Sequence, residues 1–345
     1  MKALVLEDYN KLTYKDVPKP EIHSDEVLIK VKAAGICGSD VHGMDGSSGR
    51  REPPVIMGHE ASGVIEESGS EVKGWKKGDP VTFDSTVYKL DDWYTRRGYY
   101  NLSDGRKVLG VSCEDYRLDG AFAEYVKVPA HILHKLPEGV SFTEAAMVEP
   151  LAVGAHGVEL TSVALNDTAV VVGTGMIGLS VIQIVKERGV GKIIAIDLSE
   201  EKLNIAKQVG ATHTIQPEKS NVQEEILKLT GDRGADIAFE AVGISSTLQQ
   251  AISSARRGGS VTLLGNVTPV TEFPMQYVVT RQIRVQGSCA ICGEYPAVLD
   301  MLSRKQIDIR PLLSIEAPLS EGAQWFYKLY NKEEDLVKVI LKPEE

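Results

Sequence analysis

A thiol, an imidazole and two carboxyl groups in the first half of the chain have the chemistry of metal ligands. They are Cys37, which lies between turn residues, and His59, Glu60 and Glu149. Zinc favours Cys sulfur, His nitrogen and carboxylate oxygen, and a catalytic zinc site uses three protein ligands and keeps one position open. These residue types therefore predict a zinc site on Cys37, His59 and a carboxylate.

The residues alone leave the third ligand open. Glu149 is a candidate ligand, directly or through water, and Glu60 is expected in or beside the coordination shell. Asp40, three residues after Cys37, is a candidate acceptor that would orient the His59 ring. The competing interpretation is that Cys37 is a small buried hydrophobe and His59 a hydrogen-bonded core histidine. That interpretation loses weight beside a nicotinamide site.

A glycine string marks that second site. Gly173, Gly175 and Gly178 have the spacing G-x-G-x-x-G between a strand pattern and a helical pattern, and Asp197 ends the next strand 24 residues after Gly173. The glycines permit a tight turn, close approach of backbone N–H groups to a pyrophosphate, and close helix–strand packing. A carboxylate at Asp197 can accept hydrogen bonds from the adenosine ribose and repels a 2′-phosphate. We therefore expect NAD rather than NADP, against the alternative of an empty dinucleotide fold.

A Lewis acid and a nicotinamide cofactor in one chain indicate hydride transfer to or from an alcohol carbon. The proton is expected to leave through Ser39 and His42, a hydroxyl and an imidazole three residues apart beside the metal cysteine. A water linked to Glu149 or Glu60 is the competing route.

Two adjacent arginines lie in the loop between Cys37 and His59. Arg50 and Arg51 are candidates to bind a phosphate or carboxylate on the substrate through bidentate hydrogen bonds. Ser39 is a further candidate substrate contact. If the arginines act in this way, the substrate is a sugar-alcohol phosphate or an aldonate rather than a neutral polyol.

The elements that must position these residues fall into three regions. Residues 1–150 hold many short strand patterns punctuated by Gly and Pro, which predicts a closed or sandwich-like β domain. Residues 151–288 alternate strands and helices, as at 168–172, 176–187 and 192–196, which predicts a parallel sheet covered on both faces. Residues 289–345 turn helical and end on a strand at 336–341 that is expected to rejoin the first domain.

Composition excludes several classes of protein. A net charge of −10 with no basic stripe argues against nucleic-acid binding, and four cysteines in 345 residues are too few for a disulfide framework. No apolar run reaches membrane-spanning length, and the opening strand pattern at 1–6 is too short for a signal peptide. We expect a cytoplasmic protein that acts on a small molecule, with no membrane partner.

Taken together, these motifs resemble the zinc-dependent medium-chain dehydrogenases, in which a GroES-like β-barrel catalytic domain is joined to a Rossmann domain. The resemblance covers nearly the whole chain and is strongest for the sorbitol (polyol) dehydrogenase branch, because Glu149 stands where alcohol dehydrogenases carry a cysteine ligand. It is carried by the glycine string and by the segments 35–42, 58–63, 120–125 and 149–151.

The resemblance implies an α/β protein with zinc on Cys37, His59 and Glu149, and with Glu60 in or beside the shell. It also implies a homodimer or homotetramer. Expected cofactor contacts beyond the glycines and Asp197 are Ser39, Met176, Ile177, Lys202, Val242, Gly243, Gly265 and Val267.

Two departures from the family pattern matter. Where many relatives carry four cysteines around a structural zinc, this chain has Lys89, Asp92, Thr95 and Ser103, so we expect one zinc per subunit, as in animal sorbitol dehydrogenases. At 289–291, where the sorbitol branch places an aromatic–Arg–Tyr set, this chain has Cys-Ala-Ile, which argues against sorbitol itself.

Three interpretations follow. The first is a zinc- and NAD-dependent polyol dehydrogenase. The second is the same chemistry on another alcohol, such as a sugar-alcohol phosphate resembling galactitol 1-phosphate, an aldonate or L-threonine. The third is a metal-free dinucleotide-binding or regulatory protein, which resembles the quinone-reductase branch or a structural lens-type relative.

Overall fold

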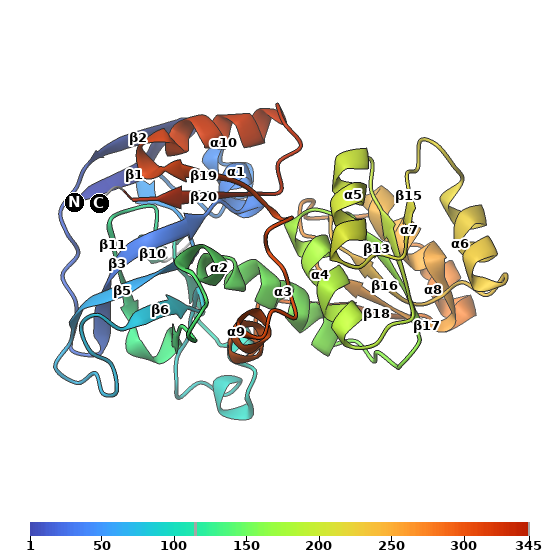
Figure 1. Ribbon diagram of the computed structural model, residues 1–345, viewed down its shortest axis with the longest axis horizontal. Coiled ribbons are helices and arrows are strands. Elements are labelled where there is room, and N and C mark those ends of the chain that lie inside the picture. The colour runs from blue at the N-terminus through green and yellow to red at the C-terminus, as the bar shows by residue number, and fades with distance from the viewer. Residues whose placement is uncertain (114–115, 344–345) are drawn as a thin grey trace. The chain divides into compact units, whose positions relative to one another are not determined.

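The computed structural model describes residues 1–113 and 116–343. The chain forms two compact units (Figure 1). Unit 1 comprises Met1–Glu149, Ile291–Arg304 and Leu313–Glu345, and unit 2 comprises Pro150–Ala290 and Lys305–Leu312.

Unit 1 is built around a seven-stranded sheet. Its central strand β3 (Glu26–Gly35) pairs antiparallel with β5 (Glu60–Ser68), β11 (Tyr125–Pro129) and the last strand of the chain, β20 (Lys338–Lys342). Pairing of β20 with β3 places Ile340 opposite Gly35. The sheet is completed by β6 (Pro80–Phe83), β12 (Leu133–Lys135) and β19 (Leu313–Pro318).

Smaller sheets and helices complete unit 1. The additional strands are β1 (Lys2–Asp8), β2 (Lys11–Asp16), β4 (Val55–Ile56), β7 (Thr86–Val87), β8 (Lys107–Val108), β9 (Val111–Cys113) and β10 (Tyr116–Leu118). The helices are α1 (Gly38–Met44), α2 (Phe142–Ala146), α9 (Tyr295–Ser303) and α10 (Gly322–Asn331), and α3 (Val148–Glu159) begins where unit 1 ends. The core draws on both ends of the chain, since the rings of Phe122 and Phe326 pack edge to face with centroids 5.6 Å apart.

Unit 2 is a parallel six-stranded sheet. The order is β15 (His213–Ile215), β14 (Lys192–Ile196), β13 (Thr168–Val172), β16 (Ala235–Glu240), β17 (Ala255–Leu263) and β18 (Arg284–Gly287). Its helices are α4 (Met176–Glu187), α5 (Glu200–Val209), α6 (Val222–Thr230), α7 (Ser245–Ser254) and α8 (Met275–Arg281). In sequence order the strands run 3-2-1-4-5-6, the doubly wound order of dinucleotide-binding domains. The predicted α/β class with a parallel sheet is therefore confirmed.

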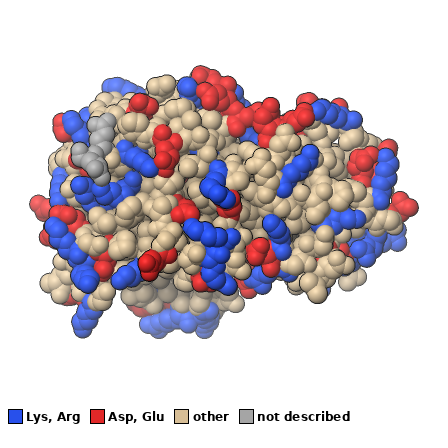
Figure 2. Space-filling view, viewed as in Figure 1, with Lys and Arg blue, Asp and Glu red and all other residues tan. Residues whose placement is uncertain are grey.

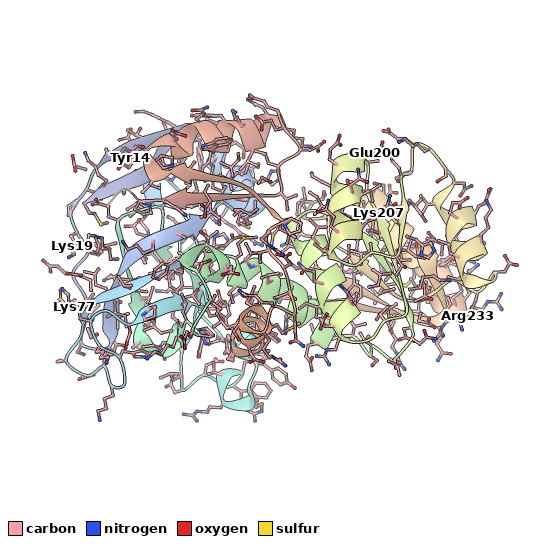
Figure 3. All side chains as sticks on the ribbon, viewed as in Figure 1. Tyr14, Lys19, Lys77, Glu200, Lys207 and Arg233 are labelled. Atoms are coloured by element: carbon pink, nitrogen blue, oxygen red, sulfur yellow. The ribbon has the colours of Figure 1, made fainter. Side chains whose placement is uncertain are left out.

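Local sequence explains where the helices begin. The hydroxyl of Ser199 accepts a hydrogen bond from the Lys202 N–H at the start of α5. Glu200 in the first turn and Lys207 in the last turn complement the helix dipole, and Figure 3 labels both on α5.

Acidic and basic side chains are interspersed over the face shown in Figure 2. Within the described part of the chain, no helix is long and apolar enough to cross a membrane.

Candidate metal centre and cofactor site

Two neighbouring strands bring the predicted metal ligands together. Strand β3 ends two residues before Cys37, strand β5 begins at Glu60, and the two strands pair with Gly35 opposite Glu60. The side chains of Cys37, His59 and Glu60 consequently offer ligand atoms that all lie within 4.8 Å of one another. The predicted convergence of a thiol, an imidazole and a carboxyl group is thus present in unit 1.

The electrostatics of this group favour a cation. Burial alone would lower the pKa of His59, but the negative charges of Asp40 and Cys37 outweigh burial and raise that pKa well above its ordinary value. His59 and Glu60 are buried, so water screens these charges little. A thiolate, an imidazole and a carboxylate are also the donor set that zinc prefers, so the residues fit the metal.

Glu60 has a partner that the sequence analysis did not identify. The Lys338 ammonium on β20 donates to both Glu60 carboxylate oxygens, at 2.9 and 2.6 Å, and to the Ile36 carbonyl oxygen at 3.0 Å. Both side chains of the pair are buried. A lysine within the otherwise apolar run 336–341 was the signal that could have revealed it.

Glu149 lies near the start of α3 and is buried. Burial raises its pKa to about 7; the nearby Glu60 and Asp84 charges add to the rise, while His59 and Lys338 oppose it. The Ser85 hydroxyl lies 3.5 Å from one Glu149 oxygen. Among the described residues the compact ligand group contains Glu60 and not Glu149, so the assignment of Glu149 as the third ligand stays a prediction.

The other predicted residues of this region lie on or beside α1. Asp40 is fully buried, and its Oδ1 atom lies 3.4 Å from His59 Nδ1, which agrees with an orienting role. Ser39 and His42 are exposed on α1. Arg50 is exposed, whereas Arg51 is buried and its guanidinium is bound to Asp40 at 2.8 Å.

The glycine string lies where β13 meets α4 in unit 2. Gly173 has φ +91°, and a Cβ atom on Gly178 would lie 1.8 Å from the Gly173 carbonyl oxygen. Only glycine allows this approach, so α4 packs tightly against the turn. The first turn of α4, with Met176 and Ile177, leaves backbone N–H groups available to an anion such as a pyrophosphate.

Asp197 follows β14 and is held by the backbone around it. Its Oδ2 atom accepts a hydrogen bond from the Thr174 N–H at 2.6 Å, and its Oδ1 atom accepts one from the Ser199 N–H at 3.0 Å. The carboxylate therefore has a fixed position beside the glycine turn. Lys202, another expected contact, is half-buried on α5.

The remaining expected cofactor contacts lie after β16 and β17. The buried Glu240 carboxylate accepts hydrogen bonds from the N–H groups of Val242 and Gly243, at 2.9 and 2.8 Å. The Gly265 backbone packs directly against this turn, and Val267 is exposed beyond it. Glu240, which the sequence analysis did not single out, thus fixes the turn in which two expected contacts lie.

The segment that carries Lys89, Asp92, Thr95 and Ser103, the residues expected in place of structural-zinc cysteines, is held by hydrogen bonds. The Asp92 carboxylate accepts from the N–H groups of Tyr94, Thr95 and Asp104, at 2.9 to 3.2 Å. The Tyr100 hydroxyl donates to Asp84 at 2.7 Å. The expectation of no structural zinc stays a prediction, supported by these contacts.

Comparisons with known proteins agree with this arrangement. Residues 23–138 match the model of the alcohol dehydrogenase GroES-like domain, and residues 177–304 match that of the zinc-binding dehydrogenases. The sorbitol dehydrogenase of Bacillus subtilis is 33% identical, over 99% of this chain and 97% of the relative.

Two solved structures share the fold. Galactitol-1-phosphate dehydrogenase from Escherichia coli has a TM-score of 0.92 and 26% identity, with 99% of this chain and 100% of that chain covered. A protein assigned as a zinc-binding dehydrogenase from Sinorhizobium meliloti, solved with NADP bound, has a TM-score of 0.91 and 30% identity, with 99% of each chain covered. The chain therefore belongs to the zinc-dependent medium-chain dehydrogenase family, is similar to its polyol dehydrogenases, and is an enzyme of the class that acts on CH–OH donors.

Proposed function

We propose that this protein is an NAD-linked dehydrogenase with one zinc ion per subunit, which interconverts a secondary hydroxyl of a polyol or sugar alcohol and the corresponding ketone. The observation that carries the proposal is the group of Cys37, His59 and Glu60, whose donor atoms lie within 4.8 Å of one another. His59 and Glu60 are buried, and Cys37 is half-buried. This group argues against the metal-free regulatory protein. When bound, zinc supplies a Lewis acid that polarises an alcohol or carbonyl oxygen.

The chain's own residues position this chemistry. Cys37 and His59 would hold the ion together with Glu60 or Glu149, and Asp40, whose Oδ1 atom lies 3.4 Å from His59 Nδ1, would orient the His59 ring. Ser39 and His42 are one helical turn apart on α1, so their side chains share a face. We propose that they carry the proton of the substrate hydroxyl towards solvent.

NAD is the proposed cofactor because of Asp197. Its carboxylate is fixed beside the glycine turn by the Thr174 and Ser199 N–H groups. A fixed negative charge there repels a 2′-phosphate, whereas it can accept hydrogen bonds from a ribose diol. One similar structure has NADP bound, so the preference for NAD needs a direct test. Turnover with NADP equal to turnover with NAD would contradict the proposed preference.

A substrate panel with a metal-ligand variant tests the proposal. NADH formation is followed with alditols, alditol phosphates, aldonates and L-threonine, and the zinc content of the protein is measured. We expect turnover of an alditol-type substrate with one zinc per chain, and loss of both zinc and turnover in Cys37→Ser. Cys113→Ser, a cysteine in β9, is the control that keeps both. Protein purified without chelator that holds no zinc, or full turnover by Cys37→Ser, would exclude the proposal.

A sugar-alcohol phosphate is the second candidate substrate. Arg50 is exposed in the loop between two metal ligands, and the similar Escherichia coli enzyme is a galactitol-1-phosphate dehydrogenase. A guanidinium binds phosphate through two parallel hydrogen bonds. Turnover of phosphorylated but not plain alditols would favour this candidate over a neutral polyol. Arg51 is buried and bound to Asp40, so we propose that it acts at the metal centre and not on the substrate.

A further inference from the structure

We propose that Arg51 is a positioning residue of the metal centre, which holds Asp40 so that Asp40 in turn fixes the His59 ring. This inference rests on the proposed zinc-dependent function. The Arg51 Nη2 atom donates to Asp40 Oδ1 at 2.8 Å, and the same oxygen lies 3.4 Å from His59 Nδ1. The other Asp40 oxygen accepts a hydrogen bond from the Cys37 N–H at 3.3 Å. One carboxylate therefore contacts the Arg51 guanidinium, the backbone of Cys37 and the ring of His59.

Hydrogen bonds and packing against α1 hold the Arg51 side chain. Its backbone is fixed by a bridge to Ser112 of β9, and its Nη1 atom donates to the Arg50 carbonyl oxygen at 3.1 Å. Its aliphatic stem lies directly on α1, because a Cβ atom on Gly43 would come within 2.4 Å of Arg51 Cγ. These contacts place the guanidinium beside Asp40.

Because Asp40 is buried, its carboxylate needs the positive charge of Arg51. Asp40 is 0% exposed and Arg51 is 2% exposed, so the carboxylate has lost its hydration. An isolated buried carboxylate is strongly unfavourable unless an opposite charge or hydrogen bonds compensate it. Arg51 supplies that charge without using the carboxylate's capacity to accept from His59, since each carboxylate oxygen has two lone pairs. Without Arg51, we expect the Asp40 carboxylate to turn away from this position, and the His59 ring to lose its orienting acceptor.

A purely structural ion pair is the competing explanation, and the chain offers a matched control for it. Arg256 in unit 2 binds Asp236 at 2.6 Å, again as an arginine–aspartate pair with a largely buried carboxylate. Loss of either arginine should cost stability. Only loss of Arg51 should change how the protein holds a metal.

Zinc affinity, measured by competition with a colorimetric chelator, is the decisive readout. We expect Arg51→Met to bind zinc about 10- to 100-fold more weakly than the unmodified protein, the range seen when a residue behind a metal ligand is lost. Arg51→Lys should recover part of the affinity, because an ammonium keeps the charge but not the planar fork. Arg256→Met should bind zinc normally. Cobalt(II) bound in place of zinc should show altered d–d absorption bands in Arg51→Met alone.

A double-variant cycle tests whether Arg51 acts through Asp40. If it does, Asp40→Asn combined with Arg51→Met should bind zinc within about threefold of Asp40→Asn alone. The inference would be overturned if the two losses of zinc affinity multiplied in the double variant. It would also be overturned if Arg51→Met folded and bound zinc normally. Should Arg51→Met not fold, the lysine variant and the double variant, which removes both charges, still decide it. An unmodified protein that binds no zinc would instead refute the proposed function.

Discussion

Lys338 and Glu60 form a buried ion pair at the candidate metal centre. At the scale of single residues, we expect loss of Lys338 to lower the stability of the protein. The Lys338 ammonium contacts both Glu60 oxygens, at 2.9 and 2.6 Å. Removing one member of a buried pair leaves an uncompensated charge and costs about 3–5 kcal/mol. We expect Lys338→Met to lose stability of this size in chelator-treated protein and less in zinc-loaded protein, where the ion can neutralise Glu60.

Urea unfolding followed by tryptophan fluorescence measures this effect selectively. All three tryptophans, Trp75, Trp93 and Trp325, lie in unit 1 with the pair. Lys342→Met on the same strand is the control, since the Lys342–Glu316 pair is partly exposed and such pairs contribute about 0–1 kcal/mol. Equal losses with and without zinc would show that the metal does not reach Glu60.

At the scale of elements, the lobe around 88–105 depends on one tyrosine. The Tyr100 hydroxyl donates to the buried Asp84 at 2.7 Å and accepts from the Gly293 N–H at 2.8 Å. Tyr100→Phe leaves the Gly293 N–H and the Asp84 Oδ2 atom without these partners, while Asp84 Oδ1 keeps the Thr86 N–H, and the expected cost is about 1–3 kcal/mol. We expect limited proteolysis to cut this lobe faster in Tyr100→Phe and at the normal rate in Tyr99→Phe, whose side chain is exposed. Faster cutting of the unmodified protein on chelator treatment would indicate a metal in the lobe instead.

Strand β12 and helix α9 meet at a histidine that should make stability depend on pH. His134 stacks on Tyr295 with ring centroids 4.8 Å apart, and burial lowers the pKa of His134 to about 4. Between about pH 6.5 and pH 4 the unfolded chain binds a proton that the folded chain does not, so stability falls as pH falls through that window. His134→Phe keeps the stack and should remove this part of the dependence. Parallel curves of melting temperature against pH for the two proteins would contradict the assignment.

The sequence predicted some elements much better than others. Strand β13, helix α4 and strand β14 have the predicted bounds, because continuous apolar strands and a 3.6-residue period leave little choice. Strand β15 was not predicted, since His213–Ile215 is only three residues long. At the site, residue type identified Cys37 and His59. Arg51 and Lys338 were not recognised as buried partners, because arginine and lysine are rarely buried and their pairing depends on distant chain segments.

At the scale of the whole molecule, the edge of the parallel sheet at β18 is a candidate interface for the expected homo-oligomer. Strand β18 is an edge strand, and α8, which precedes it, exposes Met275 and Val279 at 63% and 68%. An unpaired edge beside apolar side chains suits association with a second copy of the chain. We expect sedimentation to show an oligomer for the unmodified protein and a species near 37.5 kDa for Val279→Asp, because a charge in an apolar interface is costly. Leu165→Asp, at an exposed position elsewhere in unit 2, should leave the oligomer intact. An oligomer that survives Val279→Asp would place the interface on another surface, and a monomeric unmodified protein would remove the oligomer altogether.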